Sequence, residues 1–285
     1  MVYFAALIHP TTMIPTLSQV CCLNSPFDRD LEDFAAGQCR SVEVWLTKLE
    51  EYLKTHSLND VRFWLDKLGV QLPVASYQGG LLASQGEARK EAWDLFVRRL
   101  DLCREVGIGT IVVACDVPAP LSQQTIERVQ VSLTQVAQEA GSRDLRAALE
   151  FQADSSFGNN LQTAAALVGE VGSPHLGLCL DAYHFHVGPS KTEDLGYLTA
   201  ENLFHVQLSD LADSPRELAR DSARILPGDG DINLAAIIER LRQIDYRGCV
   251  SLELLNPQLW QVPPLQLGEI GMTALRKVLG QASMS

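Results

Sequence analysis

The sequence predicts a single α/β domain, a (β/α)8 barrel in which eight parallel strands alternate with helices. Strand-like and helix-like segments alternate nearly from end to end of the 285 residues, without a break in composition. Such alternation indicates a parallel sheet, because parallel neighbours need a crossover of about a dozen residues. Eight repeats favour closure into a barrel. An open doubly wound sheet is the alternative, but neither GxGxxG nor GxxxxGK[ST] occurs in support of a nucleotide-binding fold.

The first half of the chain contains four expected strands separated by helices. The strands are expected over residues 14–21, 41–45, 70–75 and 110–115. Helices are expected over 46–68 with a break near 57–60, over 87–106, and over 122–140. Gly107 ends the second of these, and Ser122 can cap the third. The run 110–115 is wholly apolar, as is typical of a strand buried on both faces.

The second half repeats the alternation four more times. The strands are expected over residues 146–150, 178–181, 204–207 and 249–254. Helical segments are expected over 161–171, near 194–198 and over 234–244, and a glycine-containing loop lies at 227–230. We assign residues 1–13 to a short leader that need not be ordered, and residues 14–285 to the barrel.

Composition and charge narrow the class of function. The chain is 46% hydrophobic and 20% charged, and its net charge is −12. An acidic body without a Lys/Arg run does not attract nucleic acid or an anionic membrane surface. No segment reaches the length of a transmembrane helix, and the apolar start lacks the basic residue of a signal peptide. We therefore expect a small-molecule substrate, no nucleic acid and no membrane; a homodimer is allowed.

The seven cysteines indicate the compartment. They show no CxxC spacing, and their number is odd. Cys115, Cys179 and Cys249 lie in or beside apolar runs, as buried free thiols do. The sequence therefore predicts a reducing, cytoplasmic location.

Polar side chains that can bind a hard cation end the last four expected strands. They are Glu150, Asp181, Gln207 and Glu253. Because parallel strands of a barrel point the same ends at a common centre, these side chains are expected to meet there. Two glutamates, one aspartate and one amide could hold a single divalent ion. Taken singly, each could instead be a solvated strand end, a turn residue or a core amide.

Five motifs in order resemble the xylose isomerase-like barrel superfamily. They are Leu149-Glu150, Leu180-Asp-Ala-Tyr-His184, His205-Val-Gln-Leu-Ser-Asp210, Arg224-Ile-Leu-Pro-Gly-Asp-Gly230 and Ser251-Leu-Glu253. The resemblance covers roughly residues 146–256, while the first half matches only in its β/α rhythm. It implies a TIM barrel in which Glu150, Asp181, Gln207 and Glu253 hold one metal ion. The Gln at 207 favours Mn²⁺ or Mg²⁺, with Zn²⁺ or Co²⁺ as other candidates. His205 faces the same side of its strand and is the alternative ligand.

The same resemblance implies roles for further residues. Glu150, Glu253 and His184 are expected to be catalytic, with the glutamates transferring protons and His184 also contacting the substrate. Arg224 and His205 are expected to bind the substrate, and the Arg224 guanidinium suits a carboxylate, a phosphate or a polyol oxygen. His184 could instead be a packed histidine, and Arg224 a surface loop residue. Asp210 could orient a ligand or end its strand, and Glu43 and Trp45 could line the pocket floor or belong to the core.

Three functions follow for such a site. The first is a metal-dependent isomerase or epimerase of a small keto sugar, sugar phosphate or keto acid, which transfers a proton by way of an enediolate. The second is a lyase resembling 3-dehydroshikimate dehydratase, which the motifs at 205–210 and 251–256 favour. The third is a binding barrel without catalysis, for which one of the acidic residues should be missing, and none is.

Overall fold

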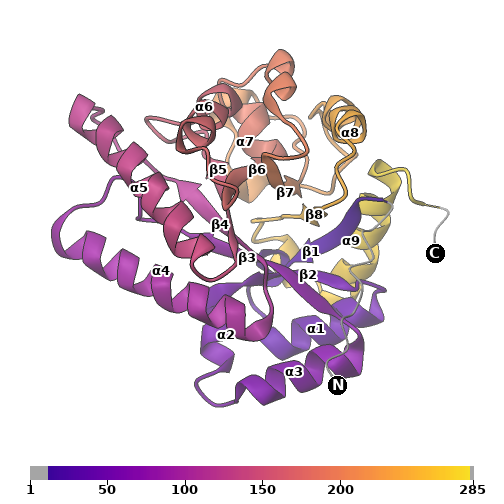
Figure 1. Cartoon of the computed structure of the whole chain (residues 1–285). Helices are drawn as coiled ribbons and strands as arrows, with labels where there is room; N and C mark the ends of the chain where they lie inside the picture. The colour runs from indigo at the N-terminus through magenta and orange to yellow at the C-terminus, as the bar shows by residue number, and fades with distance from the viewer. Residues whose placement is uncertain (1–11, 283–285) are drawn as a thin grey trace.

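A computed structural model describes residues 12–282, and in it eight strands form one closed parallel barrel in sequential order (Figure 1). The strands are β1 (Ile14–Ser18), β2 (Ser41–Trp45), β3 (Gln71–Gln78), β4 (Thr110–Cys115), β5 (Arg146–Phe151), β6 (Leu176–Asp181), β7 (Leu203–Leu208) and β8 (Cys249–Leu252). β1 pairs with both β2 and β8, which closes the ring. The predicted barrel is confirmed. The expected leader lies, except for Thr12 and Met13, outside the described residues.

Helices surround the barrel and cover the outer faces of its strands. The α-helices are α1 (Phe27–Ala36), α2 (Leu46–Tyr52), α3 (Leu58–Leu68), α4 (Gly86–Val106), α5 (Gln123–Gly141), α6 (Leu161–Val171), α7 (Ala182–Val187), α8 (Leu234–Gln243) and α9 (Pro264–Val278). Short 3-10 turns are η1 (Gln19–Cys22), η2 (Thr192–Tyr197), η3 (Arg216–Leu218), η4 (Asp221–Ala223) and η5 (Leu259–Gln261). No helix within residues 12–282 combines the length and apolarity needed to cross a bilayer.

Local sequence signals account for most of the helix ends. The Ser57 hydroxyl accepts the Asp60 N–H and the Asp60 carboxylate accepts the Ser57 N–H, a capping box that begins α3 after the expected break. Ser122 caps α5 as predicted. Gly107 follows α4 with φ of 90°, the left-handed conformation that glycine adopts without strain.

Several expected boundaries are wrong, and some elements were not expected. β1 ends at Ser18, not at residue 21, because the chain turns into η1, where the Gln19 carbonyl accepts the Trp45 N–H. The third strand begins one residue later than expected and runs on to Gln78. The expected helix near 194–198 is the 3-10 turn η2, and three helices were not expected: α1, α9 and α7, which starts directly at the end of β6.

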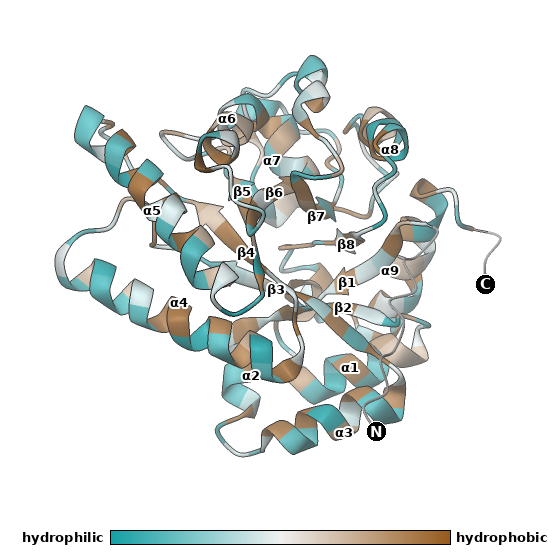
Figure 2. Cartoon of the chain, in the orientation of Figure 1, coloured by the Kyte–Doolittle hydropathy of each residue, from teal (hydrophilic) through white to brown (hydrophobic). Residues whose placement is uncertain are grey.

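The apolar core has two layers. The larger one packs between the strands and the surrounding helices, and in Figure 2 the strands are largely brown or white whereas α4 and α5 are largely teal. The smaller one fills the barrel with inward side chains of the strands, namely Val74, Val112, Ala148, Cys179, Phe204 and Cys249. Ala148 and Cys179 lie two residues before Glu150 and Asp181, so the polar strand ends rest on this apolar plug. All seven cysteines are free and buried, as predicted.

A buried ion pair ties α1 to α2 beside the mouth of the barrel. Asp30 is fully buried, and its Oδ2 accepts from Lys48 Nζ at 2.5 Å and from Gln19 Nε2 at 3.1 Å. The other end of the Gln19 amide holds the backbone of Trp45. Burial raises the pKa of Asp30 to about 7, although Lys48 opposes the shift.

This raised pKa predicts a pH-dependent stability. The pKa of Asp30 is ordinarily 3.8, so between that pH and about 7 only the folded state holds the proton. The stability that Asp30 contributes is therefore highest below about pH 4 and falls as the pH rises through about 7. In an Asp30→Asn variant, the free energy of unfolding relative to the parent should rise by a few kcal/mol, in order of magnitude, between pH 4 and 7. Urea unfolding at both pH values measures it; a constant difference would contradict it.

Candidate active site

A cavity opens at the carboxyl ends of the strands, where the sequence analysis expected the site. Its volume is about 270 Å³. The lining side chains include Trp45, Tyr77, Glu150, His184, Gln207, Arg224 and Glu253. They come from both halves of the chain, so closure of the barrel is what brings them together.

The register of the sheet directs the four expected ligands toward the barrel interior. Asp181 lies opposite Gln207, and Gln207 lies opposite Ser251, two residues before Glu253. Glu150 lies opposite Cys179, two residues before Asp181. Side chains two residues apart on a strand share a face, so all four expected ligands point into the barrel.

The two carboxylate oxygens of Asp181, at the end of β6, make different contacts. Its Oδ1 accepts the Tyr183 N–H at 2.7 Å and caps α7. Its Oδ2 lies 2.8 Å from Arg224 Nη1 and 3.8 Å from His184 Nε2. This buried oxygen is thus paired with the charge of Arg224, although among residues 12–282 no N–H or O–H is well aligned to donate a hydrogen bond to it. Burial alone would raise the pKa of Asp181, but the charge of Arg224 lowers it.

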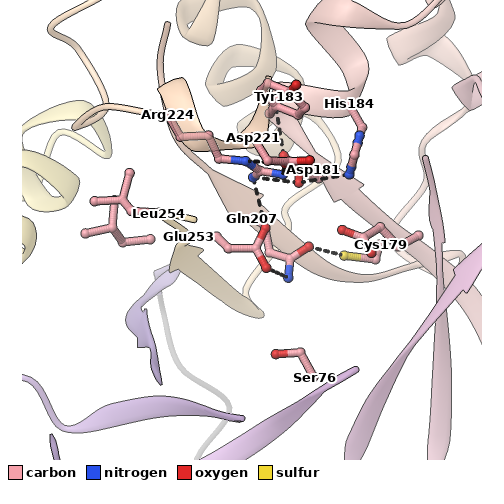
Figure 3. Close-up of polar contacts among 12 residues, drawn as sticks. Ser76, Cys179, Asp181, Tyr183, His184, Gln207, Asp221, Arg224, Glu253 and Leu254 are labelled. Atoms are coloured by element: carbon pink, nitrogen blue, oxygen red, sulfur yellow. Dashed lines mark hydrogen bonds and ion pairs between the residues drawn. The ribbon is translucent and has the colours of Figure 1, made fainter. Parts of the chain in front are cut away.

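Arg224 lies inside the protein and joins two of the carboxylates. Its side chain is 1% exposed, which excludes a surface position. Nη1 is 2.9 Å from Glu253 Oε2 as well as 2.8 Å from Asp181 Oδ2, and Nη2 contacts Asp221 at 2.6 Å. Figure 3 shows the guanidinium between Asp181 and Glu253. Burial disfavours its charge, but these three carboxylates raise its pKa above the ordinary value.

Asp210 shapes the loop that carries Arg224. Its backbone pairs with Ile225, and its carboxylate accepts the N–H groups of Gly228 and Ile232, both at 2.9 Å. A Cβ atom at Gly230 would lie 2.2 Å from the Leu211 carbonyl oxygen, so only glycine fits there. Asp210 therefore fixes the loop behind Arg224.

Both glutamates carry raised pKa values. Glu150 is buried, and burial followed by the charge of Asp181 raises its pKa to about 8. Burial raises the pKa of Glu253 well above its ordinary value, more than Arg224 lowers it. Buried carboxyl groups that exchange protons near neutral pH are suited to general acid–base chemistry.

His184 presents a donor to the cavity. The Ala153 backbone N–H donates to its Nδ1 at 3.3 Å, so the neutral ring carries its proton on Nε2. Burial lowers the pKa of His184 despite the nearby Asp181, which favours this neutral form. One ligand-type atom each from Glu150, Asp181 and His184 lies within 4.8 Å of the others. Because Nε2 holds the proton, His184 is better suited to donate a hydrogen bond than to bind a cation.

His205 faces the barrel interior, as expected, but at a deeper level. It is fully buried, its Nε2 lies 3.0 Å from Glu43 Oε2, and it does not line the cavity. A direct contact between His205 and a substrate therefore has no support in this arrangement. The contact with Glu43 was not anticipated, because strand periodicity alone does not tell which residues meet across a barrel.

Trp45 and Tyr77 form an aromatic wall of the cavity, which was harder to predict than the polar strand ends. Their rings stack with centroids 5.3 Å apart, and Tyr77 is 40% exposed. Trp45, for which a core position was the favoured interpretation, lines the cavity. Tyr77 was missed, since the expected strand ended at residue 75.

Comparisons with known proteins place this arrangement in a family. The family model of the xylose isomerase-like TIM barrel matches residues 34–278. An inosose isomerase of Halalkalibacterium halodurans is 29% identical over 244 residues, which cover 84% of this chain and 86% of that protein. A 3-dehydroshikimate dehydratase of Pseudomonas putida is 27% identical over 264 residues, which cover 89% of this chain but 40% of the dehydratase.

A solved structure agrees with the fold. The crystal structure of the IOLI protein with a binding zinc atom superposes with a TM-score of 0.88, at 24% identity, over 95% of this chain and 99% of that one. The closed barrel agrees with the family match over 34–278. The chain therefore belongs to the xylose isomerase-like TIM barrel family.

Proposed function

We propose that the chain is a divalent-metal-dependent isomerase or epimerase that moves a proton between carbon atoms of a small keto sugar, sugar phosphate or keto acid. The observation that carries the proposal is that two buried glutamates, Glu150 and Glu253, face one cavity together with Arg224 and His184. The named relatives are isomerases, epimerases and dehydratases, so the chain is an enzyme, and a binding barrel without catalysis is not supported.

The donor set fits a hard divalent cation. Asp181 is buried beside Glu150, and among the described residues Arg224 alone pairs with its Oδ2, so a divalent cation would add positive charge to a cluster of buried carboxylates. We assign Glu150, Asp181, Gln207 and Glu253 as the residues that would hold it. Four oxygen donors suit Mn²⁺ or Mg²⁺. When bound, the ion would polarise a substrate carbonyl and make the neighbouring C–H acidic.

The protein residues then divide the proton transfer between them. One of the two glutamates takes the proton from the carbon next to the carbonyl, and the other returns one to the neighbouring carbon or to the opposite face. Glu150 lies on β5 and Glu253 directly follows β8, with β6 and β7 between them, so they can flank a substrate in the cavity. The raised pKa of Glu150, about 8, suits this task, because a catalytic acid or base works best near the working pH.

His184 and Arg224 stabilise the charge that develops on the substrate. His184 Nε2–H can donate to the oxygen of the enediolate, and it does so as a neutral donor. Arg224 is held in place by Asp221 at the cavity rim, so its guanidinium is oriented before a substrate arrives. Fixed donors of this kind need little reorganisation during the reaction.

Solvent isotope exchange tests the proposed function. The protein loaded with Mn²⁺ is incubated in deuterated water with keto sugars, sugar phosphates, inososes and keto acids in turn. The expected result is deuterium on a carbon next to the carbonyl of one compound class, together with its isomer or epimer. Metal binding without exchange into any of these classes would contradict the proposal.

A dehydratase is the second candidate, favoured by one observation. The dehydratase relatives match across most of this chain. The residues that line the cavity could also serve an elimination, in which one carbon loses its proton and the neighbouring carbon loses a hydroxyl group as water. Adding 3-dehydroshikimate to the Mn²⁺-loaded protein tests this. An aromatic product, seen as a new ultraviolet absorbance, would replace the isomerase proposal; an unchanged spectrum would exclude this substrate.

The effect of an Arg224→Lys substitution on KM distinguishes between classes of substrate. If the substrate carries a carboxylate or phosphate, Arg224→Lys should raise KM by about ten- to hundredfold, because lysine cannot form the paired hydrogen bonds of a guanidinium. Loss of such contacts costs about 1.5–3 kcal/mol. A neutral polyol or ketose should show a much smaller change. Steady-state kinetics measures it.

Arg216→Lys is the matched control. Arg216 lies near the mouth of the barrel, but it is exposed. Among the described residues, the only hydrogen bond of its side chain goes to the Gly188 carbonyl. It should leave KM within about twofold, as expected for an exposed contact. Unchanged kinetics of an Arg224→Ala variant on its true substrate would remove Arg224 from the binding site.

A further inference from the structure

A fully buried carboxylate, Glu43, lies below the cavity. It comes from the middle of β2 and is 0% exposed. Its Oε1 accepts from Ser76 Oγ and from Gln207 Nε2 at 2.9 Å, and its Oε2 lies 3.0 Å from His205 Nε2. Glu43 does not line the cavity, so a substrate bound there does not touch it.

A carboxylate in this position is costly. Within residues 12–282 no lysine or arginine pairs with Glu43, and the layer beneath it is apolar. Removing a carboxylate from water costs several kcal/mol unless hydrogen bonds replace its hydration. Strand residues of a barrel interior are ordinarily branched aliphatic side chains, which would fill this space at lower cost. Because burying this carboxylate costs free energy, we expect Glu43 to have a specific role, and its contacts indicate which one.

Glu43 determines which way the Gln207 amide faces. One Nε2 hydrogen of Gln207 goes to Glu43 Oε1 at 2.9 Å and the other to Glu253 Oε1 at 3.0 Å. With the amide reversed, its carbonyl oxygen would face two carboxylates and its NH2 group would face only the Cys179 thiol. The carbonyl oxygen is therefore held on the opposite side, where it accepts a weak bond from Cys179 Sγ at 3.0 Å (Figure 3).

The same amide also controls Glu253. Because Gln207 donates to Glu253 Oε1, the other oxygen, Oε2, is the one that turns to Arg224 at 2.9 Å. A chain of hydrogen bonds thus runs from His205 through Glu43 and Gln207 to Glu253. Either oxygen of the two carboxylates can accept, but the Gln207 amide satisfies its neighbours in one orientation only, so a change at Glu43 is transmitted to Glu253 through this amide.

We propose that Glu43, supported by His205, is a positioning residue that fixes the orientation of the Gln207 amide and, through it, the Glu253 carboxylate. The consequence for metal binding rests on the proposed function, whereas the orientation of the amide does not. Partners behind metal ligands typically change metal affinity or activity by ten- to hundredfold when they are lost.

The test starts from Glu43→Gln, which keeps the size of the side chain but removes its charge. In the parent, the two side-chain N–H signals of Gln207 should be resolved by NMR and protected from solvent exchange; their loss in Gln207→Leu identifies them. In Glu43→Gln they should shift, and their exchange should quicken by about tenfold or more, as expected when a charge-assisted hydrogen bond is lost. Unchanged signals would overturn the proposal. If Glu43→Gln does not fold, Glu43→Asp tests the same point, since its shorter side chain withdraws from Gln207.

A double-mutant cycle separates positioning from a general structural role. Mn²⁺ affinity is measured by calorimetry for the parent, Glu43→Gln, Gln207→Leu and the double variant. Glu43→Gln should weaken binding about ten- to hundredfold in the parent. In the Gln207→Leu background its effect should be below about twofold, because the residue that transmits it is absent. Equal effects in both backgrounds would show that Glu43 acts by another route and would overturn the proposal.

Two further measurements complete the design. Ser76→Ala removes a donor to Glu43 without touching Gln207, and it should leave the Gln207 signals in place; a shift as large as that in Glu43→Gln would contradict the specific link. A parent protein that does not bind Mn²⁺ would defeat the proposed function, and the NMR comparison would still decide whether Glu43 orients Gln207.

Discussion

Asp181→Asn is expected to weaken Mn²⁺ binding by about a hundredfold or more, the largest effect on metal affinity that we predict. The substitution removes one of three anionic donors from a hard-cation site, where charge contributes most of the affinity. A hundredfold loss corresponds to about 2.7 kcal/mol. Asparagine can still accept the Tyr183 N–H through its carbonyl oxygen, so the cap of α7 should persist. Calorimetry with Mn²⁺ measures the affinity, and circular dichroism checks the fold.

Asp116→Asn is the matched control for this experiment. Asp116 directly follows β4 at the same face of the barrel, and its Oδ2 accepts the Gly80 N–H at 2.7 Å. Its carboxylate does not belong to the cluster of ligand-type atoms formed by Glu150, Asp181 and His184, so its variant should bind Mn²⁺ within about twofold of the parent. Parent-like affinity in Asp181→Asn would remove Asp181 from the ligand set; equal losses in both variants would point to a general effect of charge.

The barrel was predictable because its signals are local and repeated. Strands such as β4 are apolar throughout, and each lies between amphipathic helices whose ends carry recognisable caps. The boundaries that failed depend on tertiary contacts. β1 stops where a side chain at Gln19 takes over the hydrogen bond of Trp45. α7 is six residues long and begins without a loop, so no periodicity could reveal it.

From the sequence, the candidate site could be predicted only as far as the polar residues at the carboxyl ends of the strands. A polar residue lies at, or within one residue of, the carboxyl end of each of the last four strands, and this pattern can be read along the chain: Glu150, Asp181, Gln207 and Glu253. Glu43 is two residues from the end of β2, and its importance depends on Gln207, which is 164 residues away. Contacts across the barrel follow from register and closure, which the sequence specifies only collectively.

Arg224 illustrates the same limit from another direction. Its loop lies among Arg216 and Arg220, and composition alone suggested a surface position as readily as a buried one. Burial at 1% exposure follows from three distant features: the carboxylates of Asp181 and Glu253, and the loop held by Asp210. The resemblance to the family, and not the charge pattern, identified it.

Glu253→Gln is expected to lower turnover by about 10²-fold or more while part of the metal affinity remains. An amide oxygen can still bind a cation, but an amide cannot act as an acid or base. Glu253 Oε1 and Oε2 both accept hydrogen bonds, from Gln207 Nε2 and Arg224 Nη1. The new NH2 group must face one of these donors, so we also expect a moderate loss of Mn²⁺ affinity. Turnover and calorimetry on the same preparation separate the two effects.

Comparison with Glu150→Gln shows which glutamate takes the first proton from a given substrate. The variant that lacks this base should lose both deuterium exchange and product, because the C–H bond is never broken. The variant that lacks the second acid should still exchange, since the first base remains, but form product about 10²-fold more slowly. The reverse substrate should exchange the roles. Near-parent turnover in Glu253→Gln would leave Glu253 as a structural group and move the base to Glu150 or His184.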